Sequence, residues 1–143
     1  MSKRSNRILW ILTIALGVVL AGCTAAPPAY TLDDCPGIPG LEHYEGQQEV
    51  SLDSVLNAVR VALTPGNLEA DFYWDPHATN WDRLVADYSA QLDTGIWQRS
   101  QDDEAEGMAV WRSSGRGPQQ VLVLASIPAA DDARIVAVLL ATP

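Results

Sequence analysis

The first 22 residues constrain the chain most, because they separate a leader from the part that can fold into a globule. Lys3, Arg4 and Arg7 precede a largely apolar run of 14 residues from Ile8 to Ala21. A helix needs about 20 apolar residues to cross a bilayer core of about 30 Å, so this run has the length of a secretory signal segment rather than of a membrane span. Residues 23–143 remain, and they are enough for one domain.

The leader ends in Leu20, Ala21, Gly22 and Cys23. These residues resemble the lipobox of bacterial lipoprotein signal peptides, so residues 1–22 are predicted to be such a signal peptide. The resemblance implies that Leu20, Ala21 and Gly22 form the cleavage box and that Cys23 becomes the mature N-terminus. It also implies a thioether-linked diacylglycerol on Cys23 and, in many species, an amide-linked acyl chain. Two or three acyl chains make a stable membrane anchor.

The predicted anchor indicates where the folded part of the chain resides. We expect it at the cell membrane, held by lipid on the extracytoplasmic or periplasmic side. An uncleaved signal anchor, with Cys23 incidental, is the alternative and places the body on the same side. Residues 23–48 are predicted to be the lipidated N-terminus and a tether, in which Pro27 and Pro28 favour an extended backbone.

The part of the chain after the leader is strongly acidic. Residues 23–143 hold six arginines, no lysine and all 18 carboxylates, for a net charge of −12. Nucleic-acid binding requires a basic face, so we expect no nucleic-acid partner. An acidic body is repelled by anionic headgroups and stays off the membrane surface near which its tether holds it.

Helical periodicity marks two segments of this body. Both repeat apolar residues at positions i, i+3, i+4, i+7 and i+11, the first from Leu52 to Leu63 and the second from Trp81 to Leu92. The second helix is predicted to begin at Thr79 or Asn80, with Asp82 in its first turn at the positive end of the helix dipole.

Five other segments have strand patterns. Residues 68–74 alternate between apolar and polar side chains, as a strand with one buried face does. Four later runs have short, turn-rich connections, which favour hairpins and an antiparallel meander. These runs are residues 96–100, 108–112, 120–127 and 134–142. The last two are apolar on both faces, which is typical of central strands or of strands under a helix.

The predicted order of elements is therefore α-β-α-β-β-β-β. Residues 49–143 are expected to form a small α+β domain with the architecture of a two-layer sandwich. In this sandwich, two helices pack on one face of a largely antiparallel, four- to five-stranded sheet.

Three residues are candidates for chemistry. Asp75 and His77 follow the predicted strand 68–74, and a histidine beside a carboxylate is a metal-ligand pair or a general base. A metal site needs more ligands than this loop supplies, so we expect no metal and no cofactor besides the covalent lipid. Cys35 is left as an odd thiol once Cys23 is acylated, with either a structural or incidental role or a reactive one.

Four aromatic residues are candidates for an interaction surface. Aromatic side chains belong to a core by default, but helices on one face only would leave some of these rings either on the open face or covered by residues 30–48. The candidates are Tyr73, Trp74, Trp97 and Trp111.

These features predict a membrane-anchored binding or accessory module of the cell envelope. Its partner is expected to be an unidentified envelope protein, and no catalytic activity is expected. The alternative is a small metal- or thiol-dependent envelope enzyme that uses His77 and Asp75, or Cys35. A third possibility is a structural spacer between the lipid and a larger assembly.

Overall fold

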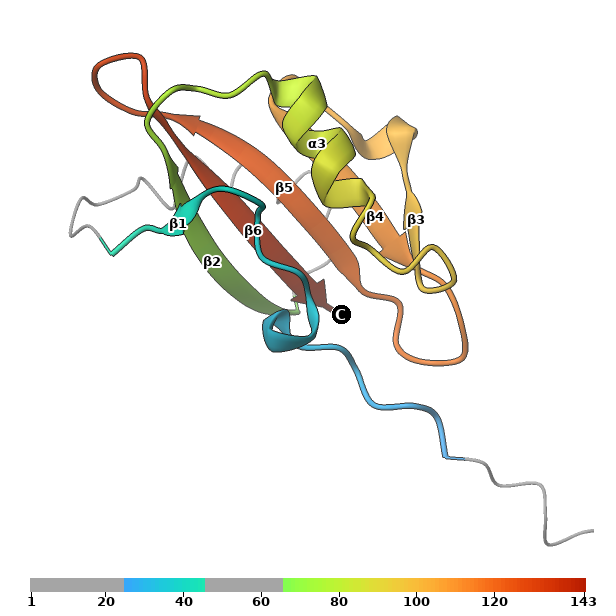
Figure 1. The fold of residues 1–143 in the computed structure, drawn as a ribbon. Coiled ribbons are helices and arrows are strands. Elements are labelled where there is room, and N and C mark those ends of the chain that lie inside the picture. The colour runs from blue at the N-terminus through green and yellow to red at the C-terminus, as the bar shows by residue number, and fades with distance from the viewer. Residues whose placement is uncertain (1–24, 46–65) are drawn as a thin grey trace, which may run out of the picture.

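The computed structural model describes residues 25–45 and 66–143, in which six antiparallel strands form one sheet with a single α-helix over it (Figure 1). The strands lie in the order β1-β2-β6-β5-β4-β3. Two 3-10 turns, η2 and η3, complete the elements. The bounds are η2 Leu32–Asp34, β1 Glu42–His43, β2 Asn67–Asp75, α3 Trp81–Ser89, β3 Trp97–Arg99, η3 Gln101–Asp103, β4 Met108–Ser113, β5 Val121–Pro128 and β6 Arg134–Thr142.

The last four strands form the antiparallel meander that their short connections predicted. β3 pairs with β4, β4 with β5, and β5 with β6, each in antiparallel register. β2 then pairs with the free edge of β6 along its whole length, from Asn67 opposite Thr142 to Asp75 opposite Arg134. β5 and β6 are therefore central strands, as their two apolar faces indicated.

The predicted fold class is wrong. Instead of two helices on a sheet of four to five strands, the described residues form a six-stranded sheet with one α-helix. The strand that was missed, β1, has only Glu42 and His43, and two residues are too few to show any periodicity. Its pairing with β2 depends on a partner far along the chain. The predicted helix from Leu52 to Leu63 lies outside the described residues.

The predicted second helix is present and begins where expected. Asn80 is the N-cap, and its Oδ1 accepts a hydrogen bond from the backbone N–H of Arg83 at 3.0 Å. The helix ends at Ser89 rather than near Leu92. Leu92 follows in a turn and is still buried, because that turn folds back toward the sheet.

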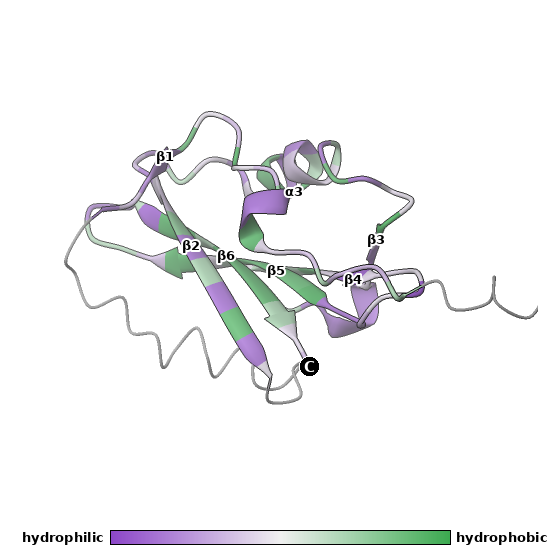
Figure 2. Cartoon of the chain, turned by 90° about the horizontal axis from the view of Figure 1, so that it is seen from below, coloured by the Kyte–Doolittle hydropathy of each residue, from purple (hydrophilic) through white to green (hydrophobic). Residues whose placement is uncertain are grey.

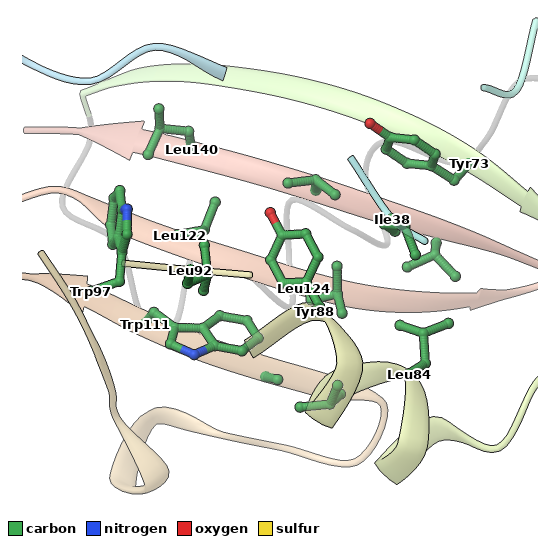
Figure 3. Close-up of a cluster of buried hydrophobic side chains, with 14 residues drawn as sticks. Ile38, Tyr73, Leu84, Tyr88, Leu92, Trp97, Trp111, Leu122, Leu124 and Leu140 are labelled. Atoms are coloured by element: carbon green, nitrogen blue, oxygen red, sulfur yellow. The ribbon is translucent and has the colours of Figure 1, made fainter. Parts of the chain in front are cut away.

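One face of the sheet is packed under α3 and the segment that leads to β1 (Figures 1 and 3). The helix contributes Leu84, Val85 and Tyr88, and Ile38 comes from the segment before β1. The central strands meet them with Leu122, Leu124, Val136, Val138 and Leu140. This face is the main core of the described residues and fixes the position of the helix.

The opposite face of the sheet holds a second apolar cluster. It consists of the alternate side chains of the same strands, among them Val110, Val123 and Leu139, which are buried. Figure 2 shows the apolar character of these strands and places α3 on the other side of the sheet. The central strands thus carry a buried apolar layer on both faces.

Candidate functional site

Three of the four candidate aromatic residues lie in the core. Tyr73, Trp97 and Trp111 are 5%, 7% and 2% exposed, and Figure 3 shows them on the helix side of the sheet. The rings of Trp111 and Tyr88 are 5.6 Å apart, and those of Trp97 and Tyr30 are 5.8 Å apart. These contacts join the sheet to α3 and to the N-terminal segment, residues 25–41, which precedes β1. The three rings therefore stabilise the fold rather than offer a surface.

The fourth aromatic residue, Trp74, lies at the edge of the sheet. It is half-buried, and its ring stacks on that of Tyr44 with centroids 5.7 Å apart. The backbone N–H of Tyr44 donates to the carbonyl of Phe72 at 2.8 Å and extends the β1–β2 pairing. The stack therefore supports the short edge strand β1.

Asp75 and Arg134 form a buried ion pair at one end of the β2–β6 pair. Asp75 is 1% exposed, and its Oδ2 accepts from the Nε of Arg134 at 2.8 Å. The same carboxylate accepts from the N–H of Thr79 at 2.8 Å and from its hydroxyl at 3.1 Å. Arg134 also donates to the carbonyl of Thr79 and lies over the ring of Trp81, 5.3 Å from its centroid. The cluster holds the loop that leads into α3 and engages both carboxylate oxygens of Asp75.

His77 is exposed in that same loop, two residues beyond Asp75. The structure does not bring it together with other ligands: in residues 25–45 and 66–143, no three His, Cys, Asp or Glu side chains are grouped as metal ligands would be. Asp75, its proposed companion, points into the ion pair with Arg134.

Cys35 is a half-buried free thiol packed against the core under the N-terminal segment. Burial, together with smaller contributions from the nearby carboxylates of Asp34 and Glu69, raises the pKa of this thiol to about 11. The thiol is thus protonated near neutral pH, whereas a nucleophilic or metal-binding cysteine needs the thiolate.

This pKa predicts a loss of stability at high pH. The ordinary pKa of the thiol is 9.0, so above that value an unfolded chain releases a proton that the folded chain retains until about pH 11. The contribution of Cys35 to stability is complete below the lower value and is lost as the pH rises through this window. Urea unfolding on both sides of the window should show a steeper decline for the natural chain than for Cys35→Ser. Equal declines in the two proteins would contradict the assignment.

A further group of contacts, which the sequence patterns missed, ties the N-terminal segment to the sheet. Gln120 is 1% exposed, and its Oε1 accepts from the N–H of Tyr30 at 2.8 Å. Its Nε2 donates to the carbonyl of Tyr30 and to the hydroxyl of Thr142, both at 2.8 Å. One signal was available, because Gln120 is a polar residue at the start of an otherwise apolar strand run.

A cleft of about 130 Å³ lies beside this group of contacts. Its walls come from Pro27, Pro28 and Tyr30 on one side and from residues 113–118 and Gln120 on the other. The side chains of the cleft include Arg116 and no carboxylate. It is formed where the predicted tether meets the connection between β4 and β5.

Comparisons of the chain with family models, curated protein sequences and solved structures gave no significant match. Of the helices in the described parts of the chain, none has the length and apolar character needed to span a bilayer.

Proposed function

We propose that this protein is a lipoprotein, anchored by acyl chains on Cys23, whose folded part is a binding or accessory module outside the cytoplasm. The proposal rests on the box Leu20-Ala21-Gly22-Cys23, which is followed within seven residues by the fixed attachment of Tyr30 to Gln120. A lipid on Cys23 would therefore hold the sheet close to the membrane rather than at the end of a long flexible linker.

Two observations favour a binding role over the enzymatic alternative. The carboxylate of Asp75 is engaged by Arg134 and Thr79, and the thiol of Cys35 is held in its protonated form. Both groups therefore act within the fold. We propose that the domain recruits or supports an envelope protein near the membrane that carries the anchor.

Mass spectrometry of the N-terminal peptide tests the anchor. The natural chain, purified from membranes, should begin at Cys23 and carry the mass of two or three acyl chains. Each buried CH₂ contributes about 0.8 kcal/mol, so this chain should partition into detergent or vesicles. Cys23→Ser should abolish acylation, and Cys35→Ser, the matched control, should leave it intact. A full-length, unacylated natural chain in the cytosolic fraction would overturn the proposal.

Crosslinking in intact cells tests the binding role. The acylated chain should be crosslinked reproducibly to an envelope protein, and the same complex should be recovered from solubilised membranes. Cys23→Ser should reduce the yield, because it removes the attachment that concentrates the domain at the membrane. Recovery of no partner by either route would contradict the binding role while leaving the anchor unaffected.

A further inference from the structure

The attachment of the N-terminal segment determines which end of the sheet lies nearest to Cys23. Gln120 binds both backbone groups of Tyr30 and also the hydroxyl of Thr142. Gln120 immediately precedes β5, and Thr142 is the last residue of β6. The chain therefore leaves the sheet at the end where β5 begins and β6 ends, and Figure 1 shows the N-terminal segment running away from that end.

The segment before Tyr30 continues along the connection between β4 and β5. A Cβ placed on Gly117 would lie 3.5 Å from the carbonyl oxygen of Pro27 and 3.6 Å from its Cγ, so Pro27 lies against this connection. Pro27 is only four positions after Cys23. A chain of that length spans at most about 14 Å when fully extended.

This end of the sheet carries one unpaired cation among several carboxylates, including the exposed Asp93, which accepts from the N–H of Gly95 close to the cleft. Arg116 is exposed at the cleft and, among the described arginines, is the one with no carboxylate within ion-pair distance. Two carboxylates nearby bind the N-terminal segment, since Asp34 accepts from Thr31 and Glu69 accepts from the N–H of Leu32. Asp33 and Asp34 are the exposed acidic residues of the same segment.

The opposite end of the sheet is acidic. Asp131 and Asp132 are exposed in the connection between β5 and β6, and the connection between β3 and β4 adds Asp102 and Glu106. The nine residues of β6 separate the two ends by about 30 Å. Electrostatic interactions with a membrane surface decay within a Debye length of about 8–10 Å, so the surface acts on the two ends separately.

We propose that the cleft and Arg116 form a contact for the phosphates of lipid headgroups in the membrane that carries the anchor. A guanidinium binds a phosphate through paired N–H donors, and the short segment after Cys23 brings Arg116 within reach of that surface. The acidic connections at the other end are repelled by the same surface and point away from it. The sheet thus stands on the membrane with the end of β6 nearest the lipid, and the acidic end is presented to the partner. This inference rests on the proposed anchor.

Fluorescence quenching on vesicles tests this orientation. The acylated chain carrying Cys35→Ser is labelled at Gln119→Cys or at Ala130→Cys, both exposed positions, one at each end of the sheet. It is then bound to phosphatidylcholine–phosphatidylglycerol vesicles that contain a headgroup nitroxide. The label at position 119 should lose most of its emission and the label at position 130 almost none. Equal quenching at the two positions would overturn the orientation.

Charge and linker variants separate the headgroup contact from attachment alone. Arg116→Glu should lower the ratio of quenching at position 119 to that at position 130 by about fivefold or more. One positive charge near an anionic membrane surface changes the binding equilibrium by about that factor, and this substitution reverses the charge. Arg83→Glu, an equal charge change on α3, should leave the ratio unchanged. Ten Gly and Ser residues inserted between Ala25 and Ala26 should bring the ratio close to one.

Flotation with the vesicles is measured on every sample. A natural chain that floats but whose ratio is insensitive to Arg116→Glu would overturn the headgroup contact and leave the anchor standing. A natural, membrane-purified chain that does not float would contradict the anchor and this inference together.

Discussion

Replacing Asp75 with alanine is expected to lower the free energy of unfolding by about 3–5 kcal/mol, because it leaves a buried charge without a partner. Arg134 is 8% exposed, and its Nε donates to Asp75 at 2.8 Å. The change also removes the acceptor for the N–H and hydroxyl of Thr79, which fix the loop into α3. This loss is a large fraction of the stability of a small domain, which is commonly about 5–15 kcal/mol.

Urea unfolding of Asp75→Ala measures this loss, and a second Asp–Arg pair supplies the control. Asp87 lies 3.7 Å from Arg83 on the exposed side of α3, where an ion pair contributes about 0–1 kcal/mol. Asp87→Ala should therefore have little effect. The double variant Asp75→Ala with Arg134→Met should recover part of the loss, since it removes the unpaired charge. Equal losses for Asp75→Ala and Asp87→Ala would show that burial of the pair contributes nothing.

The strands of the meander could be predicted because their signals are local. The runs that became β4, β5 and β6 are rich in β-branched and apolar residues, and short turn-rich connections lie between them. Such connections leave antiparallel neighbours as the simplest arrangement. The cap of α3 at Asn80 was predictable for the same reason, since a helix N-terminus is marked by the residues beside it.

The contacts that join distant parts of the chain were not predictable. Asp75 and Arg134 are 59 residues apart, and Gln120 and Tyr30 are 90 residues apart. Asp75, Arg134 and Gln120 each stand at the end of a strand run, where a polar side chain ordinarily meets solvent. Nothing in a single sequence shows that β2 pairs with β6 or that the N-terminal segment crosses the end of β5.

The same limit applies to the candidate site. Whether Tyr73, Trp97 and Trp111 are exposed depends on what covers the sheet, and the segment around Ile38 and the helix α3 both cover that face. The pKa of the Cys35 thiol likewise depends first on its burial against the core, and only the smaller effect of Asp34 comes from a sequence neighbour. The sequence shows the type of each side chain. Its burial, however, is set by tertiary packing, and burial determines what the side chain can do.

Replacing Gln120 with leucine is expected to lower the free energy of unfolding by about 2–3 kcal/mol, because three hydrogen bonds are lost from a buried amide. Leucine retains much of the side-chain volume, so the effect comes from the bonds rather than from a cavity. The bonds lost are those to the N–H and carbonyl of Tyr30 and to the hydroxyl of Thr142. The N-terminal segment should detach from the sheet before the sheet itself unfolds.

Two measurements distinguish this local release from general destabilisation. Hydrogen exchange at the amide of Tyr30 should become much faster in Gln120→Leu, whereas amides of β5 and β6 should change only by the global loss of stability. Gln119→Leu, an exposed neighbour, should leave both unchanged. Uniformly faster exchange throughout the sheet, with no excess at Tyr30, would contradict the role of Gln120. Once Tyr30 is released, the next attachment is the N–H of Leu32 bound to Glu69, so the path from Cys23 to the sheet lengthens and the orientation of the domain on the membrane should also be lost.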